Sequence, residues 1–107
     1  MKSMTIVLSM LACLAAPARA DTARVFGIGN SSCATWLSSK QFENEGSVWV
    51  MGAWSGLNIG GPKRDIGRST DGRGLVAAVK AECRRDLSVN LSQAVSTVFA
   101  TFLRAGR

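Results

Sequence analysis

The side chains best suited to catalysis are scarce or absent in this sequence. Its 107 residues contain no histidine, three cysteines, thirteen lysines and arginines, and seven aspartates and glutamates. Without an imidazole, Ser-His-Asp and Cys-His catalysis and histidine metal ligation are excluded, and three thiolates are too few for an all-cysteine zinc site. Carboxylates form no metal-binding cluster, and Gly27-Ile28-Gly29 lacks the third glycine of a dinucleotide-binding loop. We therefore expect no catalytic residue, metal or cofactor, and the chain is predicted not to be an enzyme.

Two of the three cysteines have spacing that predicts a structural disulfide. The first twenty residues resemble a secretory signal peptide: Lys2 is followed by an apolar run and by Ala18-Arg19-Ala20. Cleavage after Ala20 would remove Cys13 and leave Cys33 and Cys83 in an oxidising compartment, with one pairing available. The two cysteines are 50 residues apart, and closing such a loop stabilises a small domain by about 4 kcal/mol. A redox-active pair is the alternative, but it usually has C-x-x-C spacing.

Other fates of the N-terminal segment remain open. It could stay uncleaved as a membrane anchor, or Cys13 could become the acylated first residue of a lipoprotein. Cleavage after Ala20 would remove two of the basic residues, Lys2 and Arg19, from an 87-residue mature chain. Eleven basic and seven acidic residues would then remain, for a net charge of +4.

Four basic residues gather in a segment rich in glycine, predicted as a loop over residues 60–74. They are Lys63, Arg64, Arg68 and Arg73. Such a loop could bind a polyanion through its phosphates, and it could equally be a solvated basic loop. Specific nucleic-acid binding is not expected, because no aromatic residue lies between the charges. Weak contact with an anionic cell envelope is the form of anion binding that we expect here.

The three tryptophans, Trp36, Trp49 and Trp54, have two interpretations. They could form a surface for a client or partner protein, or they could anchor the core of a small helical domain. A chain of this size buries only a little over about 60% of the surface of its unfolded state, so we expect at least one of them to be partly exposed.

The elements that must position these residues are predicted to be helices. Residues 21–30 are predicted to form an extended arm, and residues 31–107 a single domain. Apolar residues recur at helical spacing over residues 32–40, 47–59 and 73–86, and from Asn90 to about residue 104. Residues 41–43 are expected to connect the first two helices, and Asn90 and Gln93 suggest a capping box. Gly52, Gly56 and Gly60 share one helical face that permits close approach by a neighbouring helix. The predicted fold class is all-α, a small four-helix domain whose first and third helices are joined by the disulfide.

This organisation resembles the HdeA/HdeB family of small periplasmic acid-stress proteins from Cys33 to about Phe99. The resemblance includes the cysteine spacing, the order of the helices, a glycine-containing second helix and three segments: SCATWL (32–37), DGRGLV (71–76) and VKAEC (79–83). It implies an HdeA-like fold, a periplasmic location and a holdase chaperone that opens in acid and covers unfolded proteins. Protonation of all seven carboxylates would raise the charge of the mature chain from +4 to +11.

A second family is similar in outline. The segment WVMGAWSG (49–56) resembles a helix of the Tai-type immunity proteins of secretion systems, which are also small, secreted and helical. That resemblance implies an immunity or inhibitor protein that binds one periplasmic partner. In both cases we expect a protein partner, either unfolded clients or one dedicated protein, and the sequence leaves a homodimer open.

Overall fold

The structure, a computed structural model, describes residues 23–107. The predicted signal peptide and Cys13 lie outside the described residues. A 3-10 helix and four α-helices follow one another along the chain: η1 (Gly27–Asn30), α1 (Cys33–Trp36), α2 (Lys40–Gly60), α3 (Gly72–Arg85) and α4 (Leu91–Ala105). No strand occurs in this part of the chain, and a disulfide links α1 to α3. The predicted all-α class and four-helix architecture are confirmed.

Helix α1 is a single turn, much shorter than the predicted helix over residues 32–40. The Ser32 hydroxyl caps it by accepting a hydrogen bond from the Thr35 N–H at 3.1 Å, and α1 ends at Trp36. A second cap follows, because the Ser39 hydroxyl accepts from the Phe42 N–H at 3.1 Å. Residues 41–43, predicted as a connection, therefore form the first turn of α2. Serine caps of this kind satisfy amide groups that a helix start leaves unpaired.

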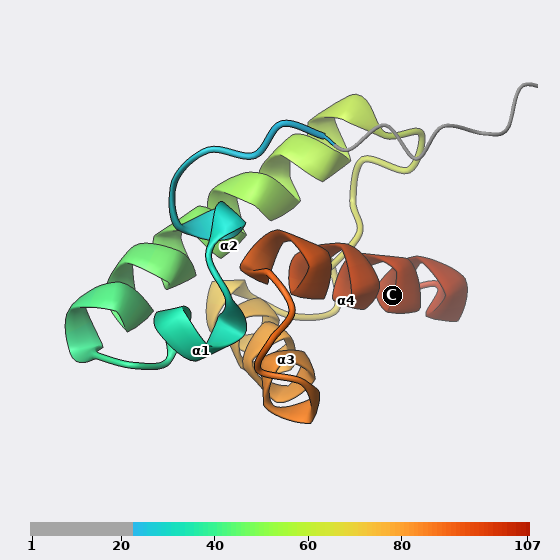
Figure 1. Cartoon of the computed structure of the whole chain (residues 1–107). Coiled ribbons are helices and arrows are strands. Elements are labelled where there is room, and N and C mark those ends of the chain that lie inside the picture. The colour runs from blue at the N-terminus through green and yellow to red at the C-terminus, as the bar shows by residue number, and fades with distance from the viewer. Residues whose placement is uncertain (1–22) are drawn as a thin grey trace, which may run out of the picture.

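Helix α2 runs along the whole domain (Figure 1). It buries one face, on which Gly46, Val50 and Trp54 follow at helical spacing. Gly46 is required there, since a Cβ at this position would overlap the indole ring of Trp36. The close helix approach expected at Gly52, Gly56 and Gly60 does not occur in the described domain. A Cβ at any of the three would meet nothing within 4 Å outside the backbone of its own helix.

Helix α3 begins at Gly72, one residue before the helix predicted over residues 73–86. Asp71 caps it by accepting from the Gly74 N–H at 2.9 Å, so the loop after α2 covers only residues 61–71. Its buried residues are Val79 and Cys83, and the helix packs against α1, α2 and α4.

Helix α4 is the most strongly amphipathic element, and it ends at Gly106, whose φ of 67° is left-handed. The predicted capping box is wrong, because Asn90 makes no side-chain cap hydrogen bond. Residues around Asn90 instead pair with the segment before α1: Ser32 and Asn90 form a β-bridge, and the Leu91 N–H donates to the Ser31 carbonyl at 2.9 Å. Backbone pairing with residues 31–32 thus holds the start of α4 beside the start of α1.

The N-terminal arm runs back along α2 and is not extended throughout (Figure 1). Its last residues, Gly27–Asn30, form η1, in which Ile28 and Gly29 are buried. Gly29 lies against the indole of Trp49, where a Cβ would overlap the ring. The core is built from all five elements and the loop after α2, and its buried residues are Ile28, Cys33, Trp36, Val50, Trp54, Ile66, Val79, Cys83, Leu91, Ala94, Val95, Val98 and Phe102.

Candidate functional site

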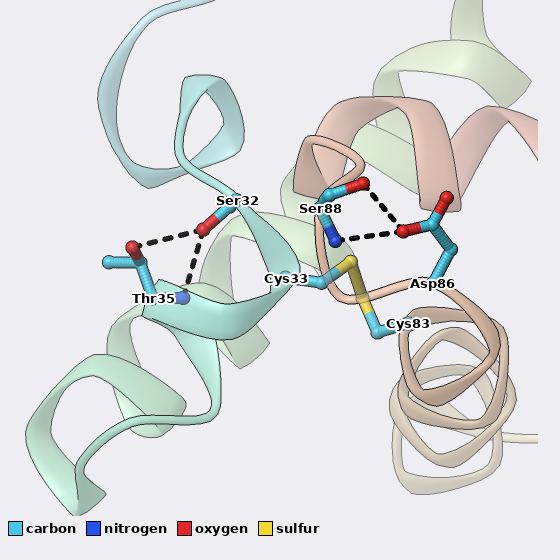
Figure 2. The surroundings of a disulfide bond; sticks show 6 residues. All are labelled: Ser32, Cys33, Thr35, Cys83, Asp86 and Ser88. Carbon is cyan, nitrogen blue, oxygen red and sulfur yellow. Dashed lines mark hydrogen bonds between the residues drawn. A yellow bond between two sulfur atoms is a disulfide. The ribbon is translucent and has the colours of Figure 1, made fainter.

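The disulfide joins two helices in the centre of the core. Cys33 and Cys83 are fully buried, and their Cα atoms lie 5.3 Å apart (Figure 2). Two backbone hydrogen bonds link the start of α1 to the connection between α3 and α4. The Cys33 N–H donates to the Val89 carbonyl at 2.8 Å, and the Ala34 N–H donates to the Leu87 carbonyl at 2.9 Å. The predicted pairing is confirmed. Its burial gives a thiol reagent no access in the folded chain, as expected for a structural disulfide.

The tryptophans divide between core and surface. Trp36 and Trp54 are 0% and 2% exposed, and their indole N–H groups donate to the carbonyls of Glu43 at 2.9 Å and Ile66 at 2.7 Å. Neither can therefore touch a partner in the folded chain. Trp49 is half-buried beside the N-terminal arm and donates to the Phe26 carbonyl at 3.0 Å. Of the three candidate partner-binding residues, only Trp49 reaches the surface.

The four basic residues predicted as one anion site do not act together. Lys63 and Arg64 are exposed in the loop, and Arg64 has a left-handed φ of 64°. Arg68 lies 3.7 Å from the Asp65 carboxylate and donates to the Gly106 carbonyl at 2.5 Å, so it ties the loop to the end of α4. Arg73 is not in the loop, because the Asp71 cap places it in the first turn of α3.

Arg73 instead lines a cleft of about 520 Å³ between α2 and α3, which we call the α2–α3 cleft. Each helix contributes one stripe of residues at helical spacing to its walls. The stripes are Lys40, Glu43, Asn44, Ser47 and Met51 from α2, and Gly72, Arg73, Val76, Ala77 and Lys80 from α3. Only Arg73 among them was predicted from the sequence as a binding residue.

An ion pair crosses one end of this cleft. The Lys80 ammonium donates to the Glu43 carboxylate and also lies 5.9 Å from the centroid of the Trp36 ring, a cation–π distance. The hydrogen bond and positive charge of Lys80 hold the pKa of Glu43 below its usual range, and Lys40 and Arg84 add to this effect. Glu43 and Lys80 therefore satisfy each other. Lys40 and Arg73 are exposed and form no ion pair within residues 23–107.

A second exposed feature lies on the solvent side of α2. Residues 46–62 contain no charged side chain, although the chain has twenty charged residues. Val48 is 67% exposed and Ile59 70%, and between them Gly52 and Ser55 are open to solvent on the same helical stripe. We call these four residues the α2 outer face. The glycine spacing marks this face in the sequence, but it does not show whether the domain itself covers it.

No family model, curated protein or solved structure matches this chain. The site must therefore be interpreted from its own geometry. Residues 23–107 hold no helix long and apolar enough to cross a membrane. Within the same residues, no three metal-ligating side chains lie close enough together to hold an ion.

Three of the six acidic residues in the described part of the chain lie where helices meet or begin. Asp86, in the connection from α3 to α4, accepts from the hydroxyl of Ser88 at 2.6 Å and from its N–H at 3.0 Å (Figure 2). These two hydrogen bonds, the hydroxyl first, lower the pKa of Asp86. Glu43 joins α2 to α3, and Asp71 caps α3. Among the described residues, no acidic side chain is buried.

Proposed function

We propose that this protein is a periplasmic protein-binding domain that acts as an acid-stress holdase of the HdeA type. The observation that carries the proposal is the α2 outer face, which holds no charge and leaves Val48 and Ile59 exposed in the folded domain. Apolar contact is non-directional and depends mainly on area, so such a face suits many different unfolded segments. The signal-peptide pattern and the disulfide support a secreted protein in an oxidising compartment.

The position of the carboxylates supports opening in acid. The folded-state pKa values of Glu43 and Asp86 lie below their ordinary values, so the stability they contribute is present above those ordinary values. That contribution is lost as the pH falls through the lower, folded-state values. Glu43 bonds α2 to α3, and Asp86 closes the turn that follows α3, so their protonation would weaken the α2–α3 contact and the connection from α3 to α4. The basic residues remain charged and repel one another.

Opening of the domain would expose apolar core side chains in addition to those of the α2 outer face. The disulfide keeps α1 attached to α3 while α2 and α4 separate from them. Trp36, Val50 and Trp54, which pack at the centre of the folded core, would then be available to clients. On this view Trp36 and Trp54 bind clients in the open state only.

Acid dependence and client binding are tested together. The chain is exported in a bacterial host, purified from the periplasm and weighed by mass spectrometry, which reports whether cleavage falls after Ala20. Far-UV and near-UV circular dichroism are then recorded at about pH 7 and about pH 2.5, beside aggregation of an acid-sensitive client protein. We expect loss of tertiary signal and suppression of client aggregation at the lower pH. A chain that stays folded there and suppresses nothing contradicts the holdase.

The alternative is an immunity or inhibitor protein with one dedicated periplasmic partner. The pre-formed α2–α3 cleft favours it, because a specific binder needs fixed polar groups in a concave site. A pH-independent complex of one-to-one stoichiometry would support this alternative, and recovery of many unrelated proteins in acid would oppose it.

A further inference from the structure

We propose that the α2–α3 cleft binds an extended acidic segment of a partner protein, with two carboxylates about five residues apart. The inference rests on the proposed protein-binding function and names the chemistry of one class of partner. It applies to the folded domain near neutral pH and not to the state that opens in acid.

The order of residues along the cleft follows from two contacts. Gly72 lies against the Met51 side chain, and Lys80 bonds Glu43, so α2 and α3 run antiparallel across the cleft. Arg73 therefore stands at one end, and Lys40 stands with the Glu43–Lys80 pair at the other. Val76 and Ala77 lie between the two ends.

The charges of the cleft are unbalanced and lie at its ends. Three cations and one carboxylate line it, and the carboxylate is already bonded to Lys80. Two positive charges, those of Lys40 and Arg73, remain for a ligand. A guanidinium can bind a carboxylate in a two-point geometry, and an ammonium binds it as a point charge. A ligand that matches the cleft has a negative group at each end.

The spacing selects a polypeptide in extended form. Gly72, next to Arg73, lies against Met51, and Met51 is eleven residues from Lys40 on α2, which corresponds to about 16 Å along a helix at about 1.5 Å per residue. An extended peptide covers the same length in about five residues at about 3.3 Å each. The residues between its two acidic side chains then lie over Val76 and Ala77, where small apolar side chains fit. Single-stranded nucleic acid fits poorly, because no aromatic side chain lines the cleft.

Fluorescence anisotropy with a labelled peptide tests the inference on the folded protein at about pH 7. The probe has two glutamates separated by about four alanines within flanking serines and glycines, and the control peptide has glutamines in place of the glutamates. We expect saturable binding of the acidic probe and at least about tenfold weaker binding of the control. Failure of the acidic probe to bind at up to about 1 mM, or equal binding of both peptides, overturns the proposal.

Matched variants separate the cleft from general electrostatic attraction. The variant K40Q/R73Q removes the two cations of the cleft that form no ion pair, and K63Q/R104Q removes the same charge from exposed positions outside it. All four side chains are exposed, and far-UV circular dichroism verifies that both variants fold. We expect K40Q/R73Q to weaken peptide binding at least about tenfold and K63Q/R104Q to change it less than about twofold. Equal losses in the two variants overturn the cleft as the site.

The same variants distinguish this inference from the proposed holdase. Peptide binding in the cleft should disappear below about pH 4, because the probe's own carboxylates are then protonated. Holdase activity should appear in that same range and survive in K40Q/R73Q. If the protein binds the peptide but suppresses no aggregation, the cleft proposal stands and the holdase proposal fails. If it suppresses aggregation but does not bind the peptide, the holdase proposal stands and the cleft proposal fails.

Discussion

Two glycines of α2 show how differently one residue type can act within a single helix. Gly46 faces inward, and the Trp36 ring occupies the space that a Cβ would need. Gly52 faces outward, and a Cβ there would meet no neighbouring element. The first glycine permits close packing of α1 on α2, whereas the second only lowers the helix propensity of an exposed position.

The substitutions G46A and G52A are therefore expected to change stability in opposite directions. Alanine at Gly46 must displace a buried indole, which costs about 1–3 kcal/mol of unfolding free energy. Alanine at Gly52 should add about 0.5–1 kcal/mol through helix propensity alone. Urea denaturation of the two variants beside the parent protein measures both. A stabilising G46A would contradict the placement of Trp36 over this glycine.

Glu43 is the acidic residue most closely tied to the packing of helices, because it pairs with Lys80 across α2 and α3. We expect E43Q to lower the urea midpoint at pH 7. Since the pairing lowers the pKa of Glu43, the difference from the parent protein should shrink as the pH falls through that lowered pKa and the parent carboxylate is protonated.

Glu45 supplies the matched control for this pH dependence. It is exposed on the same helix and forms no ion pair within the described domain. The substitution E45Q should leave the urea midpoint nearly unchanged at both pH values. An E43Q effect that persists undiminished in acid would show that something other than the carboxylate charge is lost.

At the scale of elements, the existence of four helices could be predicted, because their apolar residues recur at helical spacing. The long N-terminal extension of α2 could not, since Lys40 to Glu45 carries little apolar patterning and depends on the Ser39 cap. The predicted loop over residues 60–74 and the predicted helix over residues 73–86 overlapped at Arg73, and the Asp71 cap assigns Arg73 to α3. The candidate site was the least predictable part. The α2–α3 cleft is lined by residue stripes from two antiparallel helices, and the sequence pattern of either helix does not show which stripe of the other it faces.

The α2 outer face is an element-scale feature whose role in client binding can be measured. The variant V48S/I59S keeps α2 helical but removes the two most exposed apolar side chains of the helix. We expect apparent client affinity in the acid aggregation assay to fall about tenfold, because each side chain contributes roughly 1 kcal/mol or more when buried. The control L87S/L103S removes comparable exposed apolar groups elsewhere and should have little effect. Equal losses in the two variants would deny the outer face a special role.

For the whole molecule, the balance of charges decides how the fold responds to acid. Residues 23–107 contain eleven basic and six acidic side chains, and protonation of the acidic ones leaves only positive charge. Repulsion among these cations is long-ranged at low salt: the screening length is about 30 Å at about 10 mM salt and about 8 Å at about 150 mM.

Added salt should therefore stabilise the folded domain more in acid than at neutral pH. Between those salt concentrations we expect the melting temperature at about pH 3.5 to rise by several degrees, as about 1 kcal/mol does in a domain of this size, and to change little at pH 7. The variant R84Q/R85Q lowers the positive charge at exposed positions of α3 and should reduce the salt effect in acid.

A salt response of equal size at both pH values would show that charge repulsion does not open the fold. Loss of the hydrogen bonds at the helix joints would then have to account for acid opening on its own.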